Sequence, residues 1–304
     1  MTIELRTNNR VTFFIIISIT VAIFVLIFQK INFNEVISIF INANKLYILL
    51  SIVPLGISLF FNAVRWRSVL NAMGYKITLK ECFIIFMAAI PFSSVTPSKS
   101  GDIVRAYYLK NEIPIAHTVG SVITERIFDL AVLIFFSLIG IYFYGAHEFA
   151  LIIIVFMVFL AVFVTLTYNA SKIPVPEKWR LKIQSFCISI KDLIENRREL
   201  LSVIVSSFAI WILAILQTML LFSALSITVP PIFLIGTLPI AILIGMIPVT
   251  LGGMGTRDTA ILILFAGYAT SSQLLAVALL FSLFRYWLLA IAGLPFMRIV
   301  LKNQ

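Results

Sequence analysis

Long apolar runs separated by short polar segments dominate the chain. A helix needs about 20 apolar residues to cross the ~30 Å hydrocarbon core of a bilayer. Six runs approach or exceed this length, and each is expected to form a membrane-spanning helix: Val11–Phe28, Leu46–Val64, Val119–Tyr144, Phe149–Tyr168, Leu200–Leu225 and Leu274–Met297. The pattern predicts an all-α, polytopic membrane protein in which residues 1–304 form a single transmembrane domain.

Two further apolar regions are interrupted by helix-breaking residues. Pro91, Pro97 and Gly101 divide residues 81–109, and Pro239 and Pro248, followed by a cluster of glycines, divide residues 231–268. Unpaired backbone groups cost several kcal/mol each in hydrocarbon, so such breaks persist only where protein buries them or where they line a wet cavity. Both regions are therefore expected to form re-entrant hairpins.

The distribution of positive charge predicts the orientation. If the first hairpin enters from the cytoplasm and the second from outside, most basic residues fall on the cytoplasmic side, including Arg65, Arg67 and those of the loop 169–199. Lys30 and Lys45 fall outside. This bias satisfies the positive-inside rule, places both termini in the cytoplasm, and makes the two hairpins opposed, as in an inverted repeat.

Composition excludes a soluble protein. The chain is 61% hydrophobic and 12% charged, whereas soluble domains are about 45–50% apolar and about 25% charged. The net charge of +10 lies in short loops without interleaved aromatic residues, so no nucleic-acid partner is expected. Cys82 and Cys187 have no ligand-like spacing to either histidine, so neither a metal site nor a cofactor is expected.

The break in the first hairpin combines polar and basic residues suited to an anion. Its candidate binding residues are Ser98, Lys99, Gly101, Asp102 and Arg105. Ser98 or Ser100 can cap a helix that begins near Gly101, and the N–H groups of its first turn can bind a lipid phosphate. In the alternative interpretation the serine, aspartate and arginine side chains only satisfy one another.

Ionisable residues also lie inside the third predicted span. Glu125, Arg126 and Asp129 occur within two helical turns, and each costs ~2.5–3.5 kcal/mol at a helix centre unless it is paired. They form either an internal salt-bridge cluster or part of a substrate site. In a substrate site Arg126 would bind phosphate, or the carboxylates would receive a cationic headgroup.

The second hairpin carries a glycine-rich turn followed by charged residues. Its candidates are Gly252, Gly253, Gly255, Arg257 and Asp258. Glycines allow close backbone approach to a ligand, Thr256 can cap the helix that follows, and Arg257 lies at its positive end. Arg285 is also at membrane depth, but its neighbours Tyr286 and Trp287 are equally consistent with an interfacial anchor.

Four motifs in this order resemble the lysylphosphatidylglycerol synthase transmembrane-region family. They are Arg65-Trp66; Pro97-Ser98-Lys99-Ser100-Gly101-Asp102 with Arg105 and Leu109; Glu125-Arg126 with Asp129; and Pro248 with Gly252-Gly253-Met254-Gly255-Thr256-Arg257-Asp258. The resemblance covers nearly the whole chain and implies a flippase-like domain that handles lipids with modified headgroups. Ser93, Lys99 and Asp258 stand where the family often has Asn, Arg and Glu, which keeps the chemistry but can change the substrate.

The expected function is therefore a lipid translocator rather than an enzyme. Its substrate would be an anionic, aminoacylated or glycosylated (poly-prenyl)phospholipid, and a second copy of the chain or a lipid-synthesising enzyme are candidate partners. The soluble aminoacyl-transferase domain of the family is absent from the sequence, so the lysine-transferring activity is not expected. Two further functions stay open, namely a non-transporting partner of a glycosyltransferase and an intramembrane enzyme that uses Glu125 or Asp129 as a base.

Overall fold

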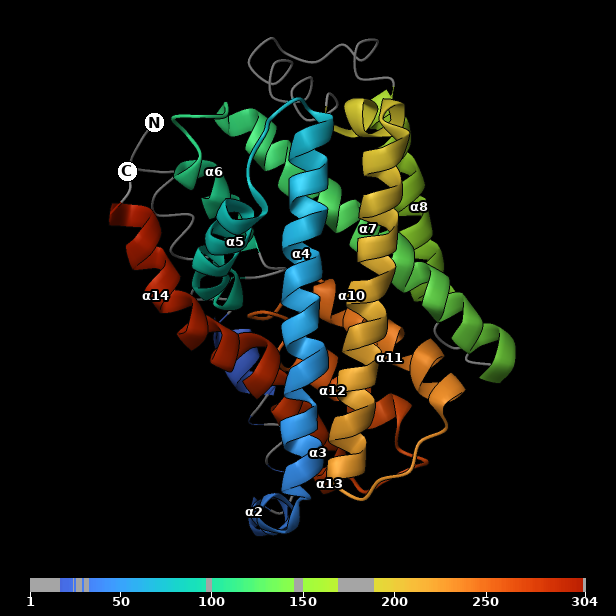
Figure 1. The fold of residues 1–304 in the computed structure, drawn as a ribbon. Helices are drawn as coiled ribbons and strands as arrows, with labels where there is room; N and C mark the ends of the chain where they lie inside the picture. Colours follow the sequence, from blue (N-terminus) through green and yellow to red (C-terminus); the bar gives the residue numbers. More distant parts are fainter. Residues whose placement is uncertain are drawn as a thin grey trace.

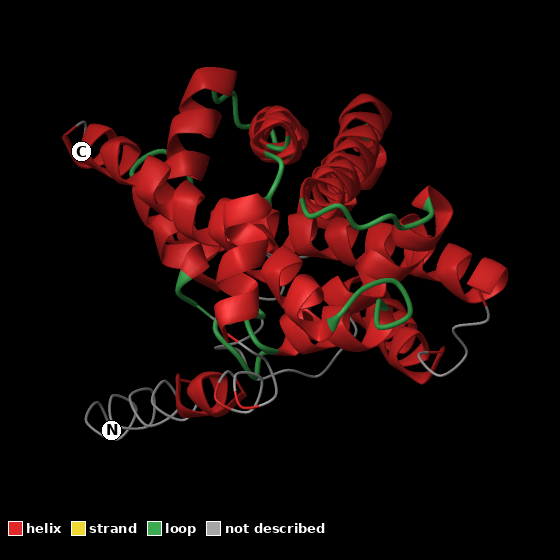
Figure 2. Ribbon diagram, turned by 90° about the horizontal axis from the view of Figure 1, so that it is seen from below, coloured by secondary structure: helices red, strands yellow, loops and turns green. Residues whose placement is uncertain are grey.

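The computed structural model describes residues 17–23, 25, 29, 33–96, 100–144, 150–168 and 189–302. All regular structure in these residues is helical (Figure 2). Four helical stretches are long and apolar enough to span a membrane, namely Lys45–Ala72, Ile115–Phe143, Arg197–Ala224 and Ser271–Lys302. The predicted polytopic helical fold is thus confirmed, while most of the expected first span, Val11–Phe28, lies outside the described residues.

Each half contains a long helix, then a hairpin of two helices, then a last helical stretch (Figure 1). The first half contains α2 (Phe33–Asn42), α3 (Lys45–Leu50), α4 (Ile52–Ala72), α5 (Leu79–Ser94), the 3-10 turn η1 (Ser100–Ile103), α6 (Val104–Tyr108) and α7 (Ile115–Tyr144). After α8 (Ala150–Tyr168), the second half contains α10 (Arg197–Ala224), α11 (Pro231–Met246), α12 (Thr256–Leu264), α13 (Ser271–Ser282), the π-helix η3 (Leu283–Leu288) and α14 (Leu289–Lys302).

Both predicted hairpins are present as a helix, a break and a shorter helix. The first, α5 followed by η1 and α6, enters from the end of the molecule where α4 ends, and the second, α11 followed by α12, enters from the opposite end (Figure 1). Local sequence explains where α5 begins, because Thr78 and Glu81 form a capping box. The two helix-breaking prolines are not equivalent in position: Pro91 lies inside α5, whereas Pro248 lies in the break after α11.

A constant offset of 152 residues relates the two halves. It separates the ends of α4 and α10 (Ala72 and Ala224), the 16-residue helices α5 and α11 (starting at Leu79 and Pro231), and the starts of α6 and α12 (Val104 and Thr256). The same offset relates Gly101 to Gly253 and Arg105 to Arg257. The two hairpins are therefore equivalent parts of an inverted repeat.

Reciprocal packing supports this equivalence. α4 packs along α10, α5 of the first half packs on α14 of the second, and α11 of the second half packs on α7 of the first. Glycines permit the last two crossings. A side chain on Gly140 would meet the backbone of Gly236 at 2.6 Å, and one on Gly293 would meet the carbonyl oxygen of Met87 at 2.5 Å. Pro91 lacks the N–H that would bond this carbonyl in an α-helix, so the two helices meet where α5 is interrupted.

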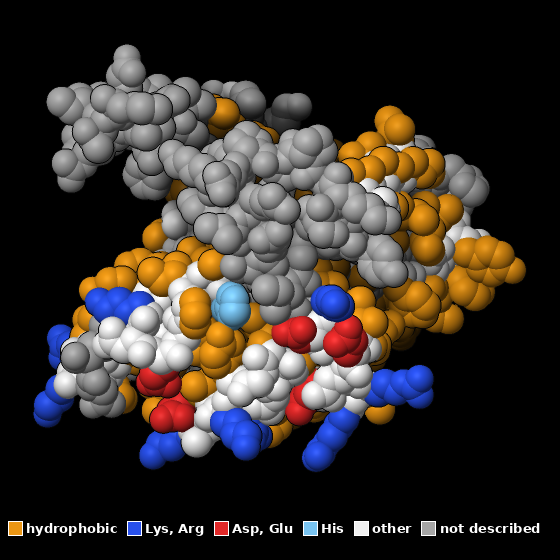
Figure 3. All heavy atoms as spheres, turned by 90° about the horizontal axis from the view of Figure 1, so that it is seen from above, with side chains coloured by type: hydrophobic (Ala, Val, Ile, Leu, Met, Phe, Trp, Pro, Cys, Tyr) orange, Lys and Arg blue, Asp and Glu red, His pale blue; other side chains and the backbone are white. Residues whose placement is uncertain are grey.

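Exposed basic residues are concentrated at the end where α4 ends and α10 begins, called here the basic end. Its blue side chains are visible together with several acidic ones in Figure 3. They include Lys76, Lys80, Lys110, Lys191, Arg197 and Arg198. Of the loop 169–199, the structure describes residues 189–199, where Leu193 is buried against Val69 and Val203.

Candidate functional site

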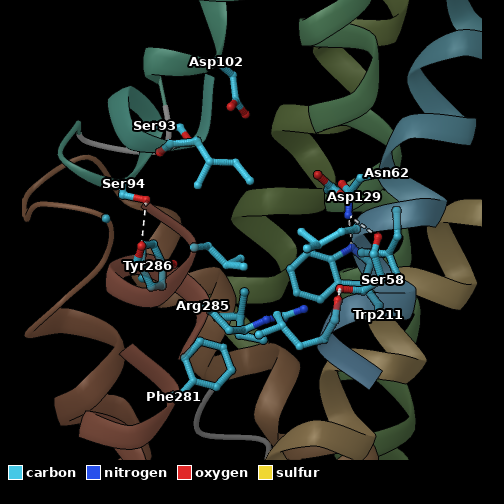
Figure 4. Close-up of a pocket in the computed structure, with 18 of the residues that line it drawn as sticks. Ser58, Asn62, Ser93, Ser94, Asp102, Asp129, Trp211, Phe281, Arg285 and Tyr286 are labelled. Atoms are coloured by element: carbon cyan, nitrogen blue, oxygen red, sulfur yellow. Dashed lines mark hydrogen bonds between the residues drawn. The ribbon is translucent and has the colours of Figure 1, made fainter. Parts of the chain in front are cut away.

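A cavity of about 130 Å³ lies where the two hairpins meet (Figure 4). Ser93 and Ser94 line it from the first hairpin, Gly252 and Arg257 from the second, and Trp211 from α10. The walls also include Arg126 and Asp129 of α7, Asp102 of η1, and Arg285 of η3. Residues from both halves thus enclose one space inside the helix bundle, called here the polar cavity because charged side chains line it beside apolar ones.

Three arginines and three carboxylates form a closed ring beside this cavity. Arg65 contacts Glu125 at 3.3 Å and Asp129 at 2.6 Å. Arg105 contacts Glu125 at 2.6 Å and Asp102 at 3.3 Å. Arg126 completes the ring, with Asp102 at 2.7 Å and Asp129 at 3.0 Å. Each charge therefore lies between two charges of opposite sign, which offsets the cost of removing it from water.

Burial divides the ring into an inner and an outer part. The side chains of Arg65, Arg105 and Glu125 are at most 1% exposed. Arg126 is 28% exposed and lines the cavity with Asp102 and Asp129. Of the two interpretations that the sequence left open, the inner three residues fit an internal cluster, whereas the outer three also face the space where a substrate would bind.

The structure corrects the expected position of Arg65. The sequence predicted that it follows a span and lies in the cytoplasm, but α4 continues to Ala72 and the guanidinium of Arg65 is buried in the ring. Trp211 was also missed. Its Nε1–H donates a hydrogen bond to Asp129 Oδ1 at 2.9 Å, and nothing in the local sequence around this tryptophan indicates that role.

The arginines of the two hairpins occupy similar surroundings. Arg105 lies over the rings of Trp66 and Phe86, at 5.0 and 5.1 Å. Arg257 lies over Phe281 at 4.6 Å, donates to Asp258 Oδ1 from Nε at 3.0 Å, and is 2% exposed. Arg105 has two carboxylate partners and does not line the cavity, whereas Arg257 is paired with Asp258 and does line it.

The glycines of the two hairpins allow close packing of backbone on backbone. Gly252, Gly253 and Gly255 have positive φ angles of 55°, 75° and 97°, which residues other than glycine rarely adopt. A side chain on Gly253 would also lie 2.5 Å from the carbonyl oxygen of Gly245, and one on Gly101 would lie 2.4 Å from that of Phe92. Of the predicted glycines, Gly252 is the one that lines the cavity.

Polar side chains already bond a backbone amide at the start of the shorter helical segment in each hairpin. The N–H of Gly101 donates to Thr96 Oγ1 at 2.7 Å, and the N–H of Gly255 donates to Asp258 Oδ2 at 3.0 Å. Thr256 is the first residue of α12, not its cap. These two amides are therefore already bonded and do not face a ligand. The predicted residues Ser98 and Lys99 lie outside the described residues.

Arg285 has a larger place in the site than its sequence neighbours indicated. It points into the cavity from η3 (Figure 4), and its guanidinium lies 5.6 Å from the centre of the Phe281 ring. It forms no hydrogen bond or ion pair with the residues that the structure describes. The carboxylate of Asp129 attracts it electrostatically without contact, but this carboxylate forms its ion pairs with Arg65 and Arg126. The sequence signal that could have identified it is its position as a charged residue inside the apolar run Leu274–Met297.

A second hollow of about 560 Å³ adjoins the first and is almost entirely apolar. Ser94 lines both spaces. Val95 comes from the tip of the first hairpin, Leu251 and Met254 from the tip of the second, and Trp287 from η3. A polar cavity next to an apolar hollow matches the two parts of an amphipathic molecule.

These features define a polytopic membrane protein with opposed re-entrant hairpins around a charged internal cavity. Residues 13–293 match the family described as "Lysylphosphatidylglycerol synthase TM region", and the chain belongs to this family. A UPF0104 membrane protein of Methanocaldococcus jannaschii is 28% identical over 91% of each chain, and one of Methanothermobacter thermautotrophicus is 26% identical over 83% of this chain and 84% of the relative. The glycosyltransferase AglD of Haloferax volcanii is 31% identical over 43% of this chain, but over 21% of its own length.

Proposed function

We propose that this protein is a translocator that moves lipids with phosphate-containing headgroups between the leaflets of the cell membrane. The observation that carries the proposal is the cavity between the two hairpins, to which both halves of the inverted repeat contribute. In transporters built from inverted repeats, discontinuous helices at the repeat interface form the substrate site near the bilayer midplane. The substrate class is an anionic, aminoacylated or glycosylated (poly-prenyl)phospholipid.

The chemistry of the two adjoining hollows supports a lipid as the substrate. Arg126, Arg257 and Arg285 face the polar cavity, and arginine is well suited to bind the oxygens of a phosphate. The apolar hollow lies on the other side of Ser94 and would receive part of an acyl or prenyl chain. A water-soluble anion would use the first space but would gain nothing from the second.

Charge at the ends of the molecule supports an orientation. The basic end would face the cytoplasm, because positive residues are retained on that side of the membrane during insertion. Among the described residues, Lys45 is exposed near the opposite end. The first hairpin would then open toward the cytoplasm and the second toward the outside. Cytoplasmic placement of both termini remains a prediction.

The proposal is tested by measuring lipid movement in vesicles that contain the purified protein. Tail-labelled phosphatidylglycerol is added in trace amounts to phosphatidylcholine vesicles, and an impermeant reductant reports how fast the inner label reaches the outer leaflet. We expect faster movement than in protein-free vesicles. Leu59→Trp should slow it because Leu59 lines the cavity. Ile57→Trp is the control, because Ile57 is on the same helix and 44% exposed.

Equal rates in protein-containing and protein-free vesicles would contradict the proposal. The folding of both variants is checked by gel filtration, so that a slow Leu59→Trp variant is not merely misfolded. If Leu59→Trp moves lipid as fast as the unchanged protein, movement does not pass through this cavity. In that case the proposed route would be wrong even if the activity exists.

A second candidate function is that of a membrane partner for a lipid-modifying glycosyltransferase. The partial match to the glycosyltransferase AglD favours it over an intramembrane enzyme. It predicts no lipid movement in vesicles, together with reduced glycosyltransferase activity in membranes from cells that lack this protein. The intramembrane enzyme has less support, because Glu125 and Asp129 are each held between two arginines that occupy the oxygens a base would use.

A further inference from the structure

The charges around the polar cavity do not cancel. The ring of three arginines and three carboxylates is neutral, and so is the pair formed by Arg257 and Asp258. Arginine is always protonated in proteins, and each of these carboxylates is in ion-pair contact with an arginine. Of the described residues that line the cavity or pair with its lining, Arg285 therefore adds one positive charge without a counterpart.

Arg285 lines the same cavity as the outer residues of the ring, and its place in the repeat is similar to that of Asp129. Counted from the helix start, it lies fourteen residues into the segment that begins with α13, and Asp129 lies fourteen residues into α7. The offset here is 156 rather than 152, because α13 starts fifteen residues after the start of α12 and α7 starts eleven residues after the start of α6. These two helices are the equivalent last spans of the two halves, and both residues line the cavity. A cation at this depth is costly unless an anion compensates it. Within the described residues no carboxylate is in ion-pair contact with it, so a bound anion would supply the missing counter-charge.

We propose that Arg285 binds the phosphate of the substrate and that this phosphate is a singly charged phosphodiester. The inference rests on the proposed function and names the chemistry of its substrate. One negative charge would neutralise the cavity when the ligand is bound. A phosphate monoester carries about −1.5 to −2 near neutral pH, so it would replace an excess of positive charge by an excess of negative charge.

The same arrangement disfavours a headgroup that carries an additional ammonium group. Asp102 and Asp129 are the carboxylates on the cavity wall, and each is already held between two arginines. An aminoacyl group would therefore bring its ammonium beside the excess positive charge of Arg285. The size of the cavity also disfavours a headgroup with an additional aminoacyl group. The cavity of about 130 Å³ is close to one of about 150 Å³ that accepts benzene, which suits a phosphate and its ester carbons.

Binding of defined lipids to the purified protein tests this inference without any transport measurement. In neutral detergent, thermal shifts are titrated with phosphatidylglycerol, phosphatidic acid and lysylphosphatidylglycerol of the same acyl chains. The unchanged protein is expected to bind phosphatidylglycerol most tightly. Arg285→Gln should weaken this binding roughly ten- to hundredfold, the effect of losing hydrogen bonds to a charged group. Arg298→Gln should not change it, because Arg298 is exposed and outside the cavity.

The Arg285→Gln variant is expected to fold, because it removes a cation that has no partner in the unliganded protein. Its melting temperature without lipid should equal or exceed that of the unchanged protein. Equally tight binding of phosphatidylglycerol by this variant would overturn the role of Arg285. A preference of the unchanged protein for phosphatidic acid or lysylphosphatidylglycerol would overturn the singly charged phosphodiester. Binding as expected without lipid movement would instead reject the translocator and keep the binding site.

Discussion

Arg65 shows how a single residue can be charged, buried and stable inside a membrane protein. It lies on α4, but its partners Glu125 and Asp129 come from α7, one helical turn apart on the same face. The ring then extends to Arg105 and Arg126, so that removing one member leaves its neighbours with a single partner each. Replacing one residue of this ring is therefore expected to destabilise the fold by more than the loss of a single ion pair.

Glu125 offers the sharpest test of the ring. Glu125→Gln leaves Arg65 and Arg105 buried, each without one of its two counter-charges. Breaking a buried ion pair typically costs ~3–5 kcal/mol, and we expect a loss of this order in thermal unfolding in detergent. Glu195→Gln is the control, because Glu195 is 66% exposed and pairs with Lys191 at 3.8 Å. That change should stay within about 0.5 kcal/mol.

Gly253 tests the packing at the tip of the second hairpin. Gly253→Ala requires a positive φ and a Cβ at 2.5 Å from the carbonyl oxygen of Gly245. We expect a destabilisation of about 1–3 kcal/mol in the same unfolding measurement. Gly267→Ala is the control, because a side chain there meets nothing within 4 Å. Similar melting temperatures for both variants would show that the hairpin tip adapts.

Sequence alone identified most charged residues of the site but not their partners. Glu125, Arg126 and Asp129 were recognisable because charges are rare inside an apolar run. Arg65 was assigned to the cytoplasm because it follows an apolar run directly, and only the fold shows that α4 carries it against α7. Arg285 was left open because Tyr286 and Trp287 are also typical of a membrane interface. Pairing between distant helices is not encoded in local spacing.

At the scale of helices, small residues determine how closely the two halves approach. Gly140 and Gly236 allow α7 and α11 to touch, as Gly293 allows α14 to touch α5. Small residues are typical of helix contacts in membranes, where lipid tails compete with apolar side chains. Proline and glycine interruptions predicted both hairpins correctly. The point of interruption was misplaced in the first, because α5 continues through Pro91 to Ser94.

The crossing of α7 and α11 is expected to be sensitive to a single methyl group. In Gly236→Ala the new Cβ would lie 2.2 Å from the Cα of Gly140, so the helices must separate. We expect a loss of about 1–3 kcal/mol, the usual cost of overpacking. Gly56→Ala in α4 meets nothing within 4 Å and should be neutral or stabilising, because alanine favours helix by about 1 kcal/mol over glycine. Unfolding curves of the two variants make the comparison.

For the whole molecule, the orientation makes a prediction that cysteine labelling can check. In a background with Cys82→Ala and Cys187→Ser, a cysteine replacing Asn111 should be protected from an impermeant reagent in intact cells. Cysteines replacing Asn42 or Thr228 should react. All three positions are exposed, the first near the basic end and the other two near the opposite end. Reaction at Asn111, with protection of the other two, would invert the proposed orientation.

The repeat was only partly visible in the sequence. Both hairpins contain a proline, a glycine and an arginine, but the structure shows that Pro91 and Pro248 are not in equivalent positions. The offset of 152 residues emerges from helix boundaries, because most positions of the two halves carry different apolar residues that serve equally well. Because one apolar residue can replace another on a membrane helix, the two halves have few identical residues by which the repeat could be recognised.

The helix α8 affects the orientation of the second half through the number of membrane crossings, not through contacts with the cavity. Its 19 residues form about 28 Å of helix, close to the ~30 Å hydrocarbon core, although it is not one of the four long apolar stretches named above. Among the described residues it packs mainly on α7 and adds nothing to the cavity wall. If α8 spans the membrane as the sequence predicts, the chain crosses three times between the start of α3 at Lys45 and the start of α10 at Arg197, with α4, α7 and α8. Three crossings are an odd number, so the second half begins on the opposite side from the first. Deleting α8 would make the number even and set the second half upside down, without removing one atom of the cavity.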